Sequence, residues 1–179
     1  MRRLLAAALL ALVASTLTAC TGGTSPSFEG FQVFEPGDRK PAPSLRGDLL
    51  DGSGAFDSTA LAGKVVVVNF WGSWCGPCVG EAPELEAVYS AHKESGAAFV
   101  GVDVLDQVDN ARAFARQHMT YPSIFDPSSR VALDFAVVPR AVPNTIILDR
   151  QGRIAAVARG QVYQTDLEPV VVDLLAEAG

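Results

Sequence analysis

Two cysteines separated by two residues stand where an apolar run gives way to a predicted helix. Cys75 and Cys78 end the segment FWGSWCGPC, which closely follows the β-branched run Val65–Val68. Backbone N–H groups and the positive dipole end at a helix N-terminus favour a thiolate over a thiol, so Cys75 is the expected nucleophile. Cys78 lies about one helical turn further on, close enough to close a small disulfide, and is the expected resolving thiol. The spacing therefore predicts a redox-active dithiol.

Two other uses of such a pair agree less well with the rest of the chain. A structural zinc site needs about four ligands. The sequence has one further cysteine, Cys20, and its two histidines, His92 and His118, lack metal-ligand spacing and are expected at the surface. A purely structural disulfide is the other alternative, although so short a loop removes little entropy from the unfolded chain. We expect neither a metal nor another cofactor.

The dithiol segment resembles the active-site motif of the thioredoxin superfamily, in which Trp-Cys-Gly-Pro-Cys follows a β-branched strand. The resemblance implies an α/β fold with a central mixed sheet and helices on both of its faces. An N-terminal hairpin and a central insertion are further features of the TlpA/ResA-like branch, whose members are membrane-anchored thiol-disulfide oxidoreductases. In such a protein Trp74, Gly76 and Pro77 would contact the substrate, while Trp71 and Trp74 would pack around the dithiol and shield it.

The resemblance also assigns a role to Pro143. It corresponds to the cis-proline of the family, which precedes the strand that faces the cysteine pair. The backbone of Val142 would then pair with a substrate segment lying beside Cys75, as an added strand. The alternative is an ordinary trans proline at the start of a strand, and Pro139 is a weaker competitor for the role.

One acidic residue, Glu81, is a candidate for tuning the cysteines. Thioredoxin has a buried aspartate six positions before its first cysteine, but this chain has Asn69 there, which cannot take a proton. The TlpA/ResA-like branch instead places a glutamate three residues after the second cysteine, and Glu81 occupies that position. A partly buried carboxylate there would raise a cysteine pKa and relay protons. The alternative is that Glu81 only complements the helix N-terminus.

The first 19 residues have the layout of a secretory signal peptide, with Arg2 and Arg3 before an apolar run that is short for a membrane span. The junction Leu-Thr-Ala-Cys20 resembles a bacterial lipobox, which implies that Cys20 is lipidated and anchors the mature protein to a membrane. Ordinary signal cleavage that leaves Cys20 free is the alternative.

The mature chain is expected to be a tether followed by one domain. Residues 20–43 are rich in Gly, Ser, Pro and polar residues and are interpreted as the lipidated N-terminus and a tether, although 31–34 alternates well enough for a short edge strand, which stays open. Residues 44–179 form the predicted thioredoxin-like domain, which we expect to be a monomer.

Charge excludes some partners. The chain has 14 basic and 20 acidic residues, for a formal charge of −6, and loss of Arg2 and Arg3 with the signal peptide would leave −8. This balance argues against nucleic-acid binding and against docking on anionic lipid through a basic patch.

The pattern of apolar and turn residues predicts the following elements. They are a hairpin within 44–62, a strand at 65–70, a helix at 79–93 containing Pro83, a strand at 97–104, a helix at 109–118 capped by Asp109, an extended piece at 121–126, a short helix at 128–134, strands at 144–149 and 154–159 around the turn 150–153, and a final helix that opens on a capping box of Thr165 and Glu168 and continues through Leu175. The acidic residues Asp103, Asp106 and Asp109 lack the glycine and distal glutamate of a calcium loop and are interpreted as solvated charges and caps.

The function that the sequence favours is that of an extracytoplasmic, lipid-anchored thiol-disulfide oxidoreductase. By resemblance, its substrates are protein disulfides, including those of cytochrome c apoproteins, and a membrane redox partner would regenerate its dithiol. The Gly-Pro dipeptide matches reducing thioredoxin, but it is one of several determinants of the potential. Formation of disulfides in secreted proteins is therefore an alternative. A thiol peroxidase of the AhpC/TSA group is a more distant alternative, because those enzymes have a lone peroxidatic cysteine in a different setting.

Overall fold

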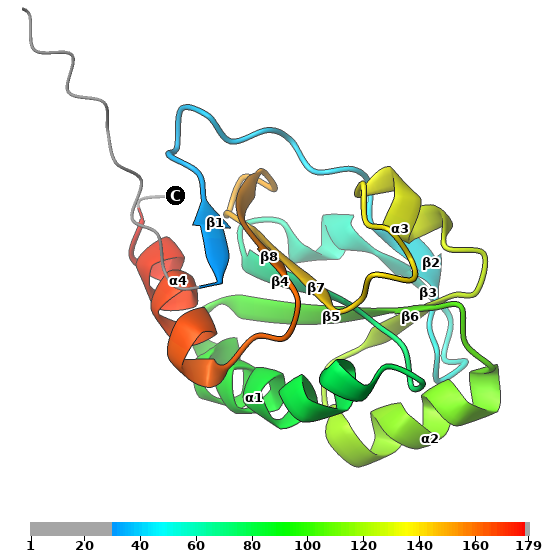
Figure 1. The fold of residues 1–179 in the computed structure, drawn as a ribbon. Helices are drawn as coiled ribbons and strands as arrows, with labels where there is room; N and C mark the ends of the chain where they lie inside the picture. Colours follow the sequence, from blue (N-terminus) through cyan, green and yellow to red (C-terminus); the bar gives the residue numbers. More distant parts are fainter. Residues whose placement is uncertain (1–29, 178–179) are drawn as a thin grey trace, which may run out of the picture.

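The computed structural model describes residues 30–177, so the predicted signal peptide and Cys20 lie outside the described residues. A six-stranded sheet forms the centre of the molecule, in the order β1-β8-β7-β4-β5-β6 (Figure 1). Its strands are β1 (Phe31–Val33), β4 (Val65–Trp71), β5 (Ala97–Val104), β6 (Ser123–Asp126), β7 (Asn144–Leu148) and β8 (Ile154–Arg159).

The sheet is mixed, as predicted. Strands β4, β5 and β6 run parallel to one another, whereas β7 is antiparallel to β4, β8 to β7 and β1 to β8. Strand β4 therefore lies between a parallel and an antiparallel neighbour, and each of its residues is buried. A strand that is buried on both faces has no polar face to alternate with the apolar one, which explains the continuous run of valines.

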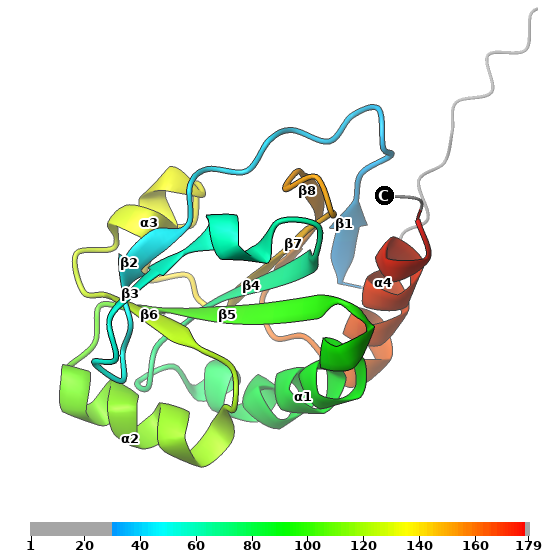
Figure 2. The ribbon, with the colours of Figure 1, turned by 180° about the vertical axis from the view of Figure 1, so that it is seen from behind.

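Three helices cover one face of the sheet and one covers part of the other (Figures 1 and 2). On the first face lie α1 (Gly76–His92), α2 (Val108–His118) and α4 (Gln164–Ala176), and on the second lies α3 (Arg130–Asp134). Alternate residues of β4 point to opposite faces of the sheet. Val65 and Val67 pack with α1 and α4, whereas Val66 and Val68 pack with α3. By the same alternation Asn69 and Trp71 point toward the α1 side.

The predicted N-terminal hairpin is present. Strands β2 (Arg46–Asp48) and β3 (Ala55–Asp57) pair in antiparallel fashion and form a separate two-stranded sheet, followed by a short 3-10 helix at Ser58–Leu61. A single bridge between Leu49 and Ile124 brings the hairpin against β6 at the edge of the main sheet.

The predicted boundary at residue 44 is too late. Strand β1 adds an edge to the main sheet by pairing with β8, so the short strand that the sequence left open does form. Phe31 is buried in the core. The Arg39 guanidinium, also buried, donates to the Phe34 carbonyl and to the carboxylates of Asp149 and Glu177. Residues 31–43 were interpreted as part of a tether because the sequence around them is rich in Gly, Ser, Pro and polar residues. Their place in the fold depends on contacts with residues more than a hundred positions later in the chain.

Two predicted helix caps are wrong. Helix α2 begins one residue before Asp109, and Asp106, rather than Asp109, accepts the N–H of its N-cap residue Gln107. Helix α4 begins at Gln164 with Tyr163 as its N-cap residue, so Thr165 lies inside the first turn. The Gln164 N–H donates to Glu84 of α1, and Glu168 hydrogen-bonds with His92. In both places a carboxylate other than the predicted one accepts a backbone N–H at the start of the helix.

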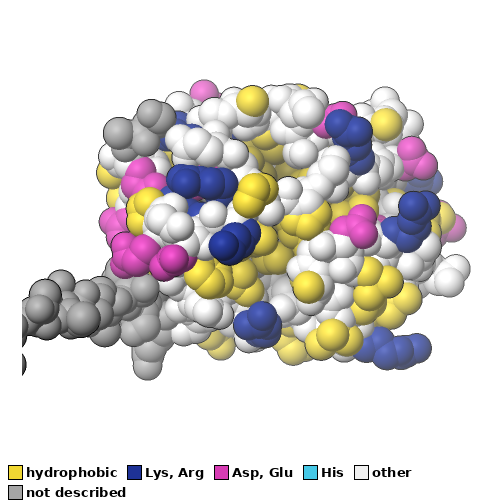
Figure 3. All heavy atoms as spheres, turned by 90° about the horizontal axis from the view of Figure 1, so that it is seen from above, with side chains coloured by type: hydrophobic (Ala, Val, Ile, Leu, Met, Phe, Trp, Pro, Cys, Tyr) yellow, Lys and Arg dark blue, Asp and Glu magenta, His cyan; other side chains and the backbone are white. Residues whose placement is uncertain are grey.

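The face that carries α3 is hollowed. An apolar groove of about 220 Å³ lies between the segment around Phe34, the end of α3 at Phe135 and the strands β7 and β8. Figure 3, which looks onto this face, shows hydrophobic side chains reaching the surface there with Lys and Arg side chains around them. Within residues 30–177, no helix is both long enough and apolar enough to cross a membrane.

Candidate functional site

The two cysteines lie at the N-terminus of α1 and are joined by a disulfide with an S–S distance of 2.03 Å. Cys75 is the N-cap residue of the helix, and its Sγ accepts the backbone N–H of Cys78 at 3.2 Å. Both side chains are buried, with 4% of Cys75 and 2% of Cys78 exposed. The first sulfur thus lies where the helix offers unpaired N–H groups and the positive end of its dipole.

The loop before β7 reaches the same sulfur. The Val142–Pro143 peptide bond is cis, as predicted for Pro143. The carbonyl oxygen of Val142 lies 3.6 Å from Cys75 Sγ. Two segments far apart in the sequence therefore meet at Cys75, namely the start of α1 and the cis-proline loop.

Glu81 is almost fully buried, with 1% of its surface exposed. Its Oε1 accepts the Asn69 side-chain N–H at 2.7 Å, and its Oε2 accepts the backbone N–H of Val162 at 3.0 Å. Burial raises the pKa of Glu81 to about 7, against the two hydrogen bonds, which lower it. Because Glu81 follows Cys78 by three residues, both lie on the same buried face of α1. A carboxyl group able to gain or lose a proton near neutral pH therefore lies one turn from the second cysteine.

The two tryptophans have different surroundings. Trp71 is fully buried, stacks on Phe114 of α2 at 4.9 Å between ring centroids, and donates its indole N–H to Ser123. Trp74 is 48% exposed, and its indole N–H donates to the Val104 carbonyl at the end of β5. Trp71 therefore packs beneath the dithiol, whereas Trp74 lies at the surface next to the exposed residues Gly76 and Pro77.

Asp103 and Asp106 are not solvated charges, contrary to the sequence interpretation. Asp103, the next-to-last residue of β5, has no exposed surface, and Asp106 is 9% exposed. Burial is the main reason that the pKa of Asp103 is raised to about 8, with the Asp106 carboxylate as the next cause. Asp103 falls on the opposite face of β5 from Val102 and Val104, toward α2.

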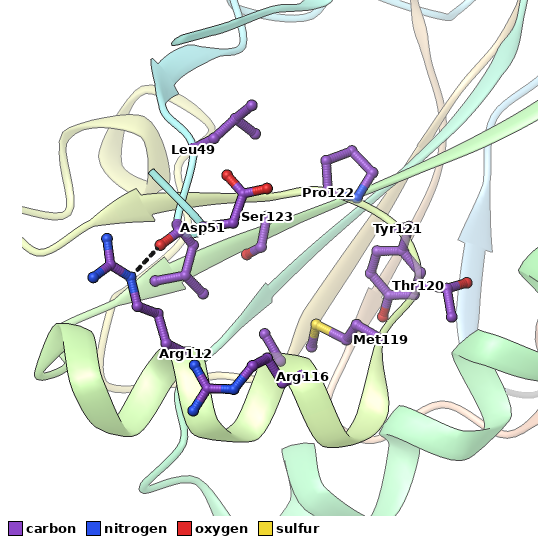
Figure 4. A pocket seen from close by; sticks show the side chains of 11 residues that line it. Leu49, Asp51, Arg112, Arg116, Met119, Thr120, Tyr121, Pro122 and Ser123 are labelled. Carbon is purple, nitrogen blue, oxygen red and sulfur yellow. Dashed lines mark hydrogen bonds between the residues drawn. The ribbon is translucent and has the colours of Figure 1, made fainter. Parts of the chain in front are cut away.

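A larger hollow lies beside the site, between the hairpin and α2. Its volume is about 480 Å³, and it extends from Leu49 and Asp51 past Arg112 and Arg116 to Tyr121. Figure 4 shows Arg112 extending from α2 to the hairpin, where its Nε donates to the Leu50 carbonyl at 2.6 Å, while Arg116 lies along the helix. Arg112 thus fastens the hairpin to α2. Among residues 30–177, no group of three or more His, Cys, Asp or Glu side chains is arranged to hold a metal ion.

The fold and this site define a class. A mixed sheet, a Cys-x-x-Cys disulfide at the start of the helix that follows a central strand, and a cis-proline against the first sulfur are together the arrangement of a thioredoxin-like redox protein. The AhpC/TSA family profile matches residues 38–157. The chain belongs to this AhpC/TSA family.

The relatives of the chain are similar over most of its length. It is 31% identical to the thiol-disulfide oxidoreductase ResA of Bacillus thuringiensis subsp. konkukian over 72% of this chain and 73% of that protein. It is 34% identical to the thiol:disulfide interchange protein HelX of Rhodobacter capsulatus over 76% of each chain. Among solved structures, a secreted thiol-disulfide isomerase from Corynebacterium glutamicum superposes with a TM-score of 0.78 and 31% identity, over 86% of this chain and 96% of the other.

These relatives and the Cys75–Cys78 disulfide establish a thiol-disulfide oxidoreductase with a thioredoxin-like fold. Membership of the AhpC/TSA family alone does not distinguish this chemistry from that of a thiol peroxidase. The named relatives favour dithiol exchange, which agrees with the presence of both cysteines in one disulfide.

Proposed function

We propose that the protein reduces disulfides of specific extracytoplasmic proteins while anchored to a membrane by lipid on Cys20, and that Cys75 is the attacking thiol. The observation that carries the assignment of Cys75 is its place as N-cap of α1, where the Cys78 N–H already donates to its sulfur. The same N–H would stabilise a Cys75 thiolate after reduction. Cys78, buried behind it, is the resolving thiol.

The exchange balances as two transfers between sulfurs. The Cys75 thiolate attacks one sulfur of the target disulfide, forms a mixed disulfide and releases the other target sulfur as a thiolate. Deprotonated Cys78 then attacks the Cys75 sulfur, which releases the second target thiolate and closes the Cys75–Cys78 disulfide. Two electrons leave the protein for the target, and the two released thiolates take up protons. In this scheme Glu81 accepts the proton of Cys78, for which its pKa of about 7 suits neutral pH.

The surface around Cys75 supports a protein as substrate. Three large apolar side chains near Cys75 are exposed: Trp74 to 48%, Val79 to 43% and Leu105 to 41%. The Trp74 indole N–H donates to the carbonyl of Val104, next to Leu105. Apolar side chains of this size on a surface are typical of a protein-binding site. We propose that the Val142 backbone pairs with an extended substrate segment, which these apolar side chains contact from the sides.

The roles of the two thiols are tested by trapping. Cys78→Ser should accumulate mixed disulfides with target proteins, because no second thiol resolves them, whereas Cys75→Ser should trap none. Non-reducing electrophoresis of extracytoplasmic protein measures both. Trapping by Cys75→Ser alone would show that the two roles are reversed, and trapping by neither variant would count against exchange through a mixed disulfide.

The direction of electron flow is part of the proposal. The Gly76-Pro77 pair and the family resemblance support reduction, with cytochrome c apoproteins as the proposed substrates and a membrane protein as the electron donor. Titration of the Cys75–Cys78 pair against glutathione mixtures should give a potential near the thioredoxin end of the range, about −270 mV. A potential near −120 mV, that of a strong oxidant, would instead support disulfide formation in secreted proteins.

The membrane anchor has a separate test. The similarity to a secreted enzyme supports an extracytoplasmic location, and the lipobox-like junction at Cys20 supports the anchor. Cys20→Ala should release the protein from the membrane fraction and leave its exchange rate unchanged, because Cys20 has no part in the dithiol cycle. Loss of exchange in the purified Cys20→Ala protein would contradict this separation of roles.

A further inference from the structure

Asp103 is a buried carboxyl group that the exchange cycle described above does not use. It has no exposed surface, and neither of its oxygens receives a hydrogen bond from any donor among residues 30–177. A carboxylate in such a place would lose its hydration without any compensating bond, which is among the costliest arrangements in a protein interior. A protonated carboxyl group avoids this cost, and it also gains an O–H that can donate.

Asp106 is the acceptor that such a proton requires. The charged groups that act on Asp103 from the packed elements of the described chain are Asp106, from the turn after β5, and Asp126, from the end of β6. Of these two, Asp106 lies within hydrogen-bond reach of the Asp103 carboxyl group. Asp126 already accepts two backbone N–H groups of the α3 region.

The three hydrogen bonds that Asp106 already accepts leave one of its carboxylate lone pairs free. Its Oδ1 accepts both the Ser73 hydroxyl at 3.0 Å and the Gln107 N–H at 2.7 Å, while its Oδ2 accepts only the Ser73 N–H at 2.6 Å. A carboxylate offers about four lone pairs, two on each oxygen. The remaining lone pair on Oδ2 can accept the proton of Asp103, so that Asp106 is bonded by four donors.

Ser73 connects this pair of acids to the reactive cysteine. It lies two residues before Cys75, and the indole N–H of the next residue, Trp74, donates to the carbonyl of Val104, the last residue of β5. Leu105, between these two contacts, has a φ of +52°, a conformation that is uncommon for a residue other than glycine. The turn therefore holds the Ser73–Trp74 segment at two places through a strained backbone, and such strain persists only where neighbouring bonds compensate for it.

We propose that Asp103 is a positioning residue for the dithiol: it shares a proton with Asp106 and so holds the Ser73–Trp74 segment in front of Cys75, and loss of that proton to solvent loosens the segment. Two carboxylates then face each other without the proton between them. Their repulsion displaces Asp106 from Ser73, and the backbone that leads into Cys75 loses its attachment to β5. The consequence for exchange rests on the proposed function, but the link between Asp103 and Ser73 does not.

The link is tested in the oxidised protein, where neither cysteine titrates. The amide resonance of Ser73 and the indole resonance of Trp74 are followed by NMR from pH 6 to 9.5. In the parent both should shift with a midpoint near pH 8. The shift should be retained in Glu81→Gln, the control for the other buried acid, and absent in Asp103→Asn, whose amide donates to Asp106 but does not titrate. Flat resonances in the parent, or a shift that persists in Asp103→Asn, would overturn the proposal. The parent measurement needs no variant to fold.

The consequence is tested in the reduced protein with a small disulfide as oxidant. The exchange rates of Asp103→Asn and the parent should agree near pH 6.5 and diverge above pH 8, where the parent becomes several-fold slower relative to the variant. A ratio that stays constant across this range would overturn the positioning role even if the resonances shift. Because a small disulfide replaces the protein substrate, failure to trap any target with Cys78→Ser would not affect this result.

Discussion

Two buried carboxyl groups flank the dithiol, and their surroundings differ. Glu81, on the α1 side, accepts a hydrogen bond from Asn69 on β4 and another from the backbone before α4. Asp103, on the α2 side, accepts none from the described residues and has Asp106 as its neighbour. Both pKa values are raised by burial, to about 7 for Glu81 and about 8 for Asp103. Burial raises both pKa values, and two hydrogen-bond donors oppose this rise at Glu81, whereas the neighbouring Asp106 carboxylate adds to it at Asp103.

The largest expected effect is on stability against pH. A raised pKa means that the folded state keeps a proton that the unfolded state has lost, so the associated stability is present at low pH and is lost as pH rises toward the folded pKa. Each such group lowers the unfolding free energy by about 1.4 kcal/mol per pH unit in that window. Asp103→Asn should remove this decline between about pH 4 and 8. Urea unfolding of the oxidised protein at several pH values measures it.

Glu81→Gln is the matched variant for that experiment. It should flatten the same curve only up to about pH 7, where Glu81 ionises. If both variants flattened the curve over the same range, or if Asp103→Asn left the parent slope intact, the contrast between the two acids would be wrong.

A smaller effect is expected on the pKa of Glu81 itself. Asn69→Ala removes the donor to Oε1 and leaves only the Val162 N–H, so the ionised form is less favoured and the pKa should rise above 7 by about one unit. The ¹³C shift of the Glu81 carboxyl group against pH, in oxidised protein, reports it. Thr145→Val is the control, because Thr145 accepts a hydrogen bond from the same Asn69 side chain but is not among the hydrogen-bond partners of Glu81. An unchanged midpoint in Asn69→Ala would mean that this donor does not tune Glu81.

The smallest effect is expected on the cysteines. Removing the Glu81 charge with Glu81→Gln should lower the apparent pKa of the Cys75 thiol, on the order of one unit, because a nearby carboxylate disfavours a thiolate. If the groups titrate as a coupled system, the macroscopic steps should move together. Alkylation rate against pH in reduced protein measures the change, and Glu94→Gln, at an exposed position in the short 3-10 helix Lys93–Ser95 that follows α1, is the control. Superimposable curves for Glu81→Gln and the parent would leave Glu81 with no influence on the thiols.

The sequence predicted the parts of the site that depend on local pattern. The β-branched run and the cysteine spacing lie within short segments and predict the strand and the helix start. The cis peptide at Val142–Pro143 was implied by the family resemblance. The burial of Asp103 was missed because it depends on α2, which covers that face of the sheet where Trp71 stacks on Phe114. A charge at the end of a strand is usually solvated, and no local pattern shows that a helix later in the chain covers it.

The surroundings of Glu81 show the same limit. Its position after Cys78 was visible in the sequence, but its donors come from β4 and from Val162, 81 residues further along. Without these partners a buried and a solvent-facing glutamate have the same local pattern. The prediction of a cap by Thr165 and Glu168 failed for a related reason, since the carboxylate that accepts the first N–H of α4 is Glu84 of α1.

Arg39 has a consequence for how the molecule opens. Its guanidinium joins the segment after β1 to Asp149, in the turn between β7 and β8, and to Glu177, just after α4, with both nitrogens at 2.6 Å from the Glu177 carboxylate. If the first strand frays, the buried Asp149 loses a cationic partner, and the end of α4 is released as well. Amide hydrogen exchange should therefore show these segments opening together as one cooperative unit, although more than a hundred residues separate them along the chain.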